Sequence, residues 1–184
     1  MDLSIKSMKI NNDITLSYLS STLRSMGPIT ITKDFIKYRN EHADKFNDYG
    51  RTEEEKIRNS DALLVEYMLI NGNHAQRPKN IVHDFIINEK HIDNKMLSED
   101  ATTVTIPNRK EGWMKSAVVY GDLTHFSISK WVSRPDECKG DKGRCLREGD
   151  VVELDIVSVM DAREALRSLQ DSFYYANSKF FWVK

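Results

Sequence analysis

The first hundred residues show apolar side chains at helical spacing. Between residues 16 and 26 leucines and a methionine recur at intervals of three and four, which predicts a helix. Gly27 and Pro28 follow at once and should end it, since this pair is typical of a helix C-terminus. Asn12 or Asp13 has the short polar side chain that caps a helix start. We therefore expect the first helix to run from there to residue 26.

Two further helices follow from the same period. An aromatic stripe between residues 35 and 49 predicts a second helix, which Gly50 should close. Thr52 and Glu55 form the Thr-x-x-Glu pattern of a capping box, so a third helix should begin there. Its last part, residues 62–70, is apolar almost all round, with Glu66 as the exception. We expect this part to be the buried centre of the helical half, with Leu64 and Met68 inside.

The segment 78–97 is the ambiguous one. Its apolar residues suit a helix, which we favour, but the run "IVHDFII" also suits a strand, and periodicity alone does not separate the two. On a helix, His83 and His91 would lie roughly 80° apart around the axis, a poor arrangement for sharing a metal ion.

After residue 100 the period changes to two. Short β-branched and aromatic runs predict strands at "TTVTIP", "WMKSAVVY", "LTHFSISKWV", "DVVELDIVSV" and "KFFWV". A helix is predicted near 161–176, with Asp161 and Glu164 at its start. Strand, helix and strand in succession predict that the last two strands are parallel neighbours.

In two of these strands, the alternation of apolar and polar residues predicts which face of the sheet contacts water. Phe126, Ile128 and Val132 alternate with His125, Ser127 and Ser129, which favours a sheet with one wetter face. Glu153 and Asp155 alternate with apolar neighbours and are typical of an exposed strand face.

Together the patterns predict the α+β class. We expect a helical N-terminal half packed on a small mixed, mostly antiparallel sheet from the C-terminal half. The chain of 184 residues is long enough for one sizeable core, so we expect a single domain over 1–184. Within it, 1–99 is the helical sub-region and 100–184 the β-rich sub-region with its one helix near 161–176.

Composition and charge narrow the function classes. Hydrophobic residues make up 40% of the chain and charged residues 30%, as in ordinary globular proteins. The formal net charge of −1 indicates no bulk attraction to nucleic acid or to a membrane surface. The first ten residues lack the apolar core of a signal peptide, and the longest apolar run is too short to span a bilayer. We therefore expect a cytoplasmic protein without a membrane partner.

The stretch "RPDECKGDKGRC", residues 134–145, holds the densest candidate chemistry. Cys138 and Cys145 are the two cysteines of the chain. Structural zinc draws on two close ligand pairs, and a second pair is not found here. Free thiols are the favoured interpretation, with a disulfide or a metal-ligand pair as alternatives. We expect no metal and no cofactor, and we expect this stretch to be a surface loop between two strands.

The same region also permits an enzyme hypothesis. A metal-dependent nuclease needs carboxylates for Mg²⁺ and a lysine to orient water, and Asp122, Glu137 and Lys139 could supply them. Glu153 and Asp155 add carboxylates on a nearby strand. Such acids usually lie at the end of a core strand, whereas residues 136–143 are polar and glycine-rich. The nuclease is therefore an alternative, which convergence of these carboxylates in one cleft would support.

Aromatic and basic residues interleave in the second half. Flat rings can stack on unpaired bases while cations neutralise phosphate, which favours single-stranded nucleic acid as a partner. Interspersed acids nearly cancel the positive charge. The candidate binding residues are Arg109, Lys110, Trp113, Lys130, Trp131, Lys139, Lys142, Arg144 and Arg147.

The leading hypothesis for function is a non-enzymatic intracellular binding or assembly protein. It would act through protein–protein contacts, self-association included. The sequence has no phosphate-cradling glycine loop, no nucleophile elbow and no close metal-ligand pairs. A single-stranded nucleic-acid-binding protein and a metal-dependent nuclease are the two alternatives.

Overall fold

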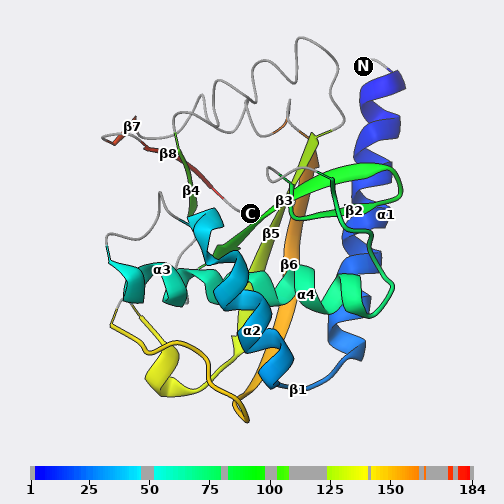
Figure 1. Cartoon of the computed structure of the whole chain (residues 1–184). Coiled ribbons are helices and arrows are strands. Elements are labelled where there is room, and N and C mark those ends of the chain that lie inside the picture. The colour runs from blue at the N-terminus through cyan, green and yellow to red at the C-terminus, as the bar shows by residue number, and fades with distance from the viewer. Residues whose placement is uncertain are drawn as a thin grey trace.

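The protein is an α+β structure, as predicted, in which helices from the N-terminal half pack against a mixed five-stranded sheet (Figure 1). The computed structural model describes residues 3–46, 52–79, 83–97, 103–107, 124–140, 142–161, 164, 174–175 and 178–182.

In the described residues up to Asn71, the chain forms four α-helices and a very short strand. Their bounds are α1 Leu3–Ser25, β1 Ile29–Thr30, α2 Lys33–His42, α3 Glu53–Asn59 and α4 Leu63–Asn71, with 3-10 turns η1 Ala43–Phe46 and η2 Ser60–Ala62.

Local sequence signals account for several of these helix ends, although the third predicted helix is divided into α3 and α4 by the 3-10 turn η2. Gly27 adopts a left-handed φ of 62° just after α1, so the predicted end of this helix is confirmed. The capping box at the start of α3 is also confirmed: the Glu55 amide donates to Thr52 Oγ1 at 3.1 Å, and the Thr52 amide donates to the Glu55 carboxylate at 3.2 Å.

Two helix boundaries differ from the prediction. α1 begins at Leu3, so Asn12 and Asp13 lie inside the helix and do not cap it. Asn12 is instead buried, with 4% of its surface exposed. α2 ends at His42 and continues as the 3-10 turn η1, short of the predicted end near residue 49.

The prediction of a helix over 78–97 is wrong. Residues Phe85–Ile87 form β2 and Lys90–Leu97 form β3, an antiparallel hairpin with Phe85 opposite Ile92. Asn88 and Glu89 both have positive φ, 49° and 64°, which is the geometry of a tight two-residue hairpin turn. Two strands, β2 and β3, therefore lie within residues 1–99, the sub-region that was expected to be helical.

The main sheet has the strand order β1-β6-β5-β3-β2. Strands β5, Thr124–Ser133, and β6, Val151–Asp161, form its antiparallel centre, and β3 pairs with β5 in parallel. α1 runs along β6, while α2 and α4 pack on one another in front of the sheet (Figure 1).

A second, three-stranded sheet has the order β4-β8-β7 and is antiparallel throughout. Its strands are β4 Thr103–Pro107, β7 Tyr174–Tyr175 and β8 Ser178–Trp182. The predicted parallel pairing of the last two long strands is wrong, because β6 and β8 belong to different sheets. The predicted strand "WMKSAVVY" and most of the helix predicted near 161–176 lie outside the described residues. The described start of that helix is capped, since the Glu164 amide donates to Asp161 Oδ1 at 2.8 Å.

The expected wet face of β5 is buried. Ser127 and Ser129 are both 0% exposed, and their hydroxyls donate to Asn94 Oδ1 on β3. Val132, expected on the inner face, is 52% exposed. Register shifts after Ile128 and after Trp131 break the simple alternation that the sequence predicted.

The core confirms the central position of α4. Leu63, Leu64, Val65 and Leu69 are each at most 2% exposed and belong to the main hydrophobic cluster. Met68, predicted to be buried with Leu64, is only partly buried, because it borders a hollow at the surface.

Candidate functional site

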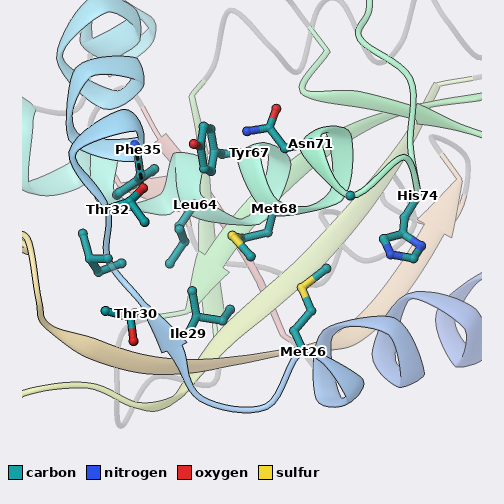
Figure 2. A pocket seen from close by; sticks show the side chains of 12 residues that line it. Met26, Ile29, Thr30, Thr32, Phe35, Leu64, Tyr67, Met68, Asn71 and His74 are labelled. Carbon is teal, nitrogen blue, oxygen red and sulfur yellow. Dashed lines mark hydrogen bonds between the residues drawn. The ribbon is translucent and has the colours of Figure 1, made fainter.

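An apolar hollow of about 450 Å³ lies between the end of α1, β1, the start of α2 and α4. Figure 2 shows the side chains of Met26 and Met68 facing one another across it, with Ile29 and Leu64 beside them. Tyr67 and Asn71 border it from α4. Its volume is in the range of sites that take a small molecule or one large apolar side chain.

The hollow exists because several elements end around it. Gly27 turns the chain out of α1, and Thr32 caps α2 by accepting a hydrogen bond from the Phe35 amide at 3.2 Å. α4 ends at Asn71, and Gly72 follows. A Cβ at Gly72 would lie 2.8 Å from the His74 ring, so a residue without a side chain lets the chain fold back here.

Exposed apolar side chains on α1 extend this hollow into a surface. Ile14 and Tyr18, four residues apart on one helix face, are 61% and 44% exposed. The Tyr18 hydroxyl lies 3.4 Å from His74 Nδ1, and His74 borders the hollow. We call Ile14, Tyr18, Met26, Met68 and His74 the α1–α4 surface. It offers van der Waals contact and a few hydrogen-bonding groups, which suits binding rather than bond-breaking chemistry.

The stretch 134–145 connects β5 to β6, as predicted, but it is anchored at its end by a buried ion pair. Arg39 on α2 contacts Asp61 at 2.8 Å, and their side chains are 7% and 3% exposed. Asp61 Oδ2 accepts a hydrogen bond from the Leu146 amide at 3.0 Å, and Arg39 donates to the Leu146 carbonyl at 2.7 Å. Burial raises the pKa of Asp61, while the Leu146 amide and Arg39 act in the opposite direction.

The cations of this loop differ in whether they form ion pairs within it. Arg144 forms a fork-shaped ion pair with Asp150, at 2.8 and 3.2 Å, and also donates to the Cys145 carbonyl. The hydrogen bond to Asp150 raises the pKa of Arg144. Lys139 contacts Asp136 at 2.6 Å, whereas Lys142 and Arg147 are exposed. Arg144 is therefore already engaged within the loop.

Of the remaining predicted binding residues, Lys130 and Trp131 lie on β5. The Arg134 guanidinium carbon lies 5.0 Å from the centre of the Trp131 ring, a cation–π distance, and Trp131 packs against the core. Lys130 is exposed. Arg109, Lys110, Trp113 and the nuclease candidate Asp122 lie outside the described residues.

Of the carboxylates considered for a nuclease, Glu137 and Asp155 have separate surroundings. Glu137 is exposed on the 3-10 turn η3 Asp136–Cys138. Asp155, predicted on an exposed strand face, is instead 4% exposed, because α1 covers it. In the part of the chain that the structure describes, no group of three or more His, Cys, Asp or Glu side chains could hold a metal ion.

Asp155 is bound from α1 by two side chains. The Ser20 hydroxyl donates to Oδ1 at 2.6 Å, and Arg24 donates to Oδ2 from Nη2 at 2.8 Å and from Nε at 3.1 Å. Burial acts to raise the pKa of Asp155, but the hydrogen bonds from Ser20, Arg24 and the Ile156 amide outweigh it, so that the pKa lies below its ordinary value.

Both cysteines are free thiols in the structure. Cys138 is 1% exposed and Cys145 is partly buried, and burial raises the pKa of each thiol. Such thiols stay protonated at neutral pH and are poor nucleophiles. Gly143 packs directly on this position: a Cβ there would lie 2.3 Å from the Cys138 carbonyl oxygen.

Sequence reasoning considered the pair of His83 and His91 but placed the two residues apart, because it assigned them to a helix. In the hairpin, the rings of His83 and His91 lie with their centres 5.1 Å apart. The signal that could have found them is Asn88-Glu89 between two apolar runs, since asparagine tolerates the positive φ of a tight turn. The pairs Arg39–Asp61 and Arg24–Asp155 carried no comparable local signal.

No helix in the described ranges is long and apolar enough to cross a membrane. No protein-family model, no curated protein and no solved structure matches this chain.

Proposed function

We propose that this protein is a non-enzymatic binding or assembly protein of the cytoplasm that contacts a protein partner through the α1–α4 surface. The observation that supports this is the apolar hollow lined by Met26, Met68 and His74, together with the exposed side chain of Tyr18, which contacts His74, and that of Ile14 one turn earlier on α1. Exposed large apolar side chains beside a hollow are a common feature of surfaces that bind other proteins.

The chemistry of the surface indicates the kind of partner. Methionine side chains are flexible and polarisable, so Met26 and Met68 can adjust to an apolar side chain that enters between them. Tyr18 and His74 supply polar atoms at the edge of the contact. The partner should therefore present a large aliphatic or aromatic residue, and a second copy of this chain qualifies. The proposal requires no cofactor.

The test is a pair of charge substitutions on α1. The Ile14→Asp, Tyr18→Asp variant should abolish self-association in sedimentation velocity, or release a partner that co-purifies stoichiometrically from the native source. Both side chains are well exposed, so the fold should be retained. Val132→Asp is the matched control, because Val132 is also an exposed apolar residue, 52% exposed on β5.

Two outcomes would contradict this proposal. One is a monomeric wild-type protein that retains no stoichiometric partner. The other is an assembly that survives the double substitution on α1 but is lost in Val132→Asp, which would place the contact on the sheet.

Single-stranded nucleic acid is the second candidate partner, favoured by the Trp131 ring with Arg134 over it and by exposed cations in the loop that follows. Lys142 and Arg147 are exposed, and Arg134 lies over the Trp131 ring. A base could stack on this ring only by displacing Arg134, since the ring also packs against the core. In an anisotropy titration with a labelled oligonucleotide, Lys142→Ala with Arg147→Ala should weaken binding and reduce its salt dependence. Unchanged affinity would remove these two cations from any nucleic-acid contact.

A further inference from the structure

A second hollow, of about 430 Å³, lies on the other side of α1, between this helix and strands β5 and β6. Its lining is mostly polar, unlike that of the α1–α4 surface. The polar residues that line it are Ser17, Ser20, Ser21, Arg24, Lys130 and Asp155.

Arg24 is held in one orientation at this hollow. Its Nε and Nη2 both donate to Asp155 Oδ2, at 3.1 and 2.8 Å, and the Ser20 hydroxyl holds the other carboxylate oxygen. Nη1 has no hydrogen bond to any described residue, and the Arg24 side chain is 72% exposed although its partner is 5% exposed. The buried carboxylate therefore positions a guanidinium that has donors left for another group.

Lys130 on β5 brings a second cation to the same hollow. It is exposed, and within the described ranges it has no ion-pair partner. Among the described residues that line the hollow, two cations, Arg24 and Lys130, accompany one carboxylate, that of Asp155, so this lining carries a net positive charge. The hydroxyls of Ser17 and Ser21, also exposed, add groups that can donate or accept.

We propose that this hollow binds the phosphate monoester of a small polyhydroxylated molecule, such as a sugar phosphate. Arg24 Nη1 and the Lys130 ammonium contact the phosphate oxygens, since a guanidinium held by a carboxylate and a mobile lysine are both suited to phosphate. The exposed hydroxyls of Ser17 and Ser21 bond to the hydroxyls of the ligand, because the Asp155 carboxylate already accepts four hydrogen bonds. The volume of the hollow leaves room for more than a phosphate group, which is why the ligand carries a polyol.

This site is separate from the proposed protein-binding function. It uses the face of α1 toward β6 and no residue of the α1–α4 surface. Each proposal can therefore fail without the other.

Isothermal titration calorimetry at low ionic strength tests the site with three probes: a hexose monophosphate, the same hexose without phosphate, and inorganic phosphate. The hexose monophosphate should bind most tightly and should also raise the melting temperature. Lys130→Ala should weaken the binding of the hexose monophosphate by about tenfold, because one charge-assisted contact is lost. Lys130→Arg, which keeps the charge, should retain most of the affinity. Lys142→Ala, an exposed cation outside the hollow, should bind as the wild type does.

Several results would overturn this proposal. If neither the hexose monophosphate nor inorganic phosphate released or absorbed heat on titration, the site would not exist. Equal binding of the hexose with and without phosphate would refute the roles of Arg24 and Lys130. If inorganic phosphate bound as tightly as the sugar phosphate, the proposal that the ligand's polyol contributes to binding would be refuted. Equal weakening by Lys130→Ala and Lys142→Ala would indicate nonspecific attraction to the surface. Circular dichroism of each variant confirms folding, which exposed lysines should not disturb.

Discussion

The buried pair of Arg39 and Asp61 carries the most demanding prediction for stability. It joins α2, the turn η2 and the end of the β5–β6 loop, because both side chains bond to the backbone of Leu146. In Asp61→Ala the Arg39 guanidinium stays buried without a carboxylate, and the Leu146 amide loses its acceptor. We therefore expect the fold to weaken and the end of the loop to loosen.

The magnitude follows from burial. Removing one partner of a buried ion pair costs about 3–5 kcal/mol, because the remaining charge is not solvated. The unsatisfied amide belongs to the same loss and is not added to it. Domains have unfolding free energies of roughly 5–15 kcal/mol, so Asp61→Ala should remove a large part of the total.

Urea denaturation followed by far-ultraviolet circular dichroism measures this loss. Asp136→Ala is the control, because its ion pair with Lys139 involves a carboxylate that is 91% exposed and should leave the midpoint nearly unchanged. The double variant Arg39→Met, Asp61→Leu should recover much of the lost stability, since it removes both charges together. If Asp61→Ala proved as stable as the control, the reasoning about the buried pair would be refuted.

Three further predictions concern single residues. Leu64→Ala should lower the unfolding free energy by about 2–5 kcal/mol through the cavity it leaves, and a change near zero would remove α4 from the core. Gly143→Ala should cost about 1–3 kcal/mol in the same assay, because its Cβ would meet the Cys138 carbonyl at 2.3 Å; full stability would contradict this packing. Asp155→Asn should destabilise the protein at neutral pH. Because the pKa of Asp155 is lowered in the fold, its contribution is present above the ordinary value of about 4 and is lost as the pH falls through the folded value. The gap between wild type and variant, measured by urea midpoints, should therefore shrink in acid; a constant gap would refute the charge effect.

Much of the secondary structure could be predicted from the sequence because its signals are local. The capping box of Thr52 and Glu55 needs only four consecutive residues, and Gly27 ends α1 by its own backbone conformation. The long strands β5 and β6 were predicted from β-branched and aromatic runs. The helix predicted over 78–97 is wrong because apolar spacing alone does not indicate the tight turn at Asn88 and Glu89.

The candidate sites depended on contacts between distant segments. Asp155 alternates with apolar neighbours in the way an exposed residue does, yet α1 covers it and supplies Ser20 and Arg24, more than a hundred residues earlier in the chain. The α1–α4 surface likewise joins the end of α1 to α4, and no local pattern reports that they meet.

The sequence by itself determined the α+β class, several helix ends and the central strands, because backbone preferences and side-chain periodicity act within a few residues. Only the tertiary structure decided which polar residues are buried, which strands pair and where the two hollows lie. Those outcomes depend on which surfaces come to face one another, and a buried charge such as Asp61 is tolerated only where a distant partner, Arg39, arrives to meet it.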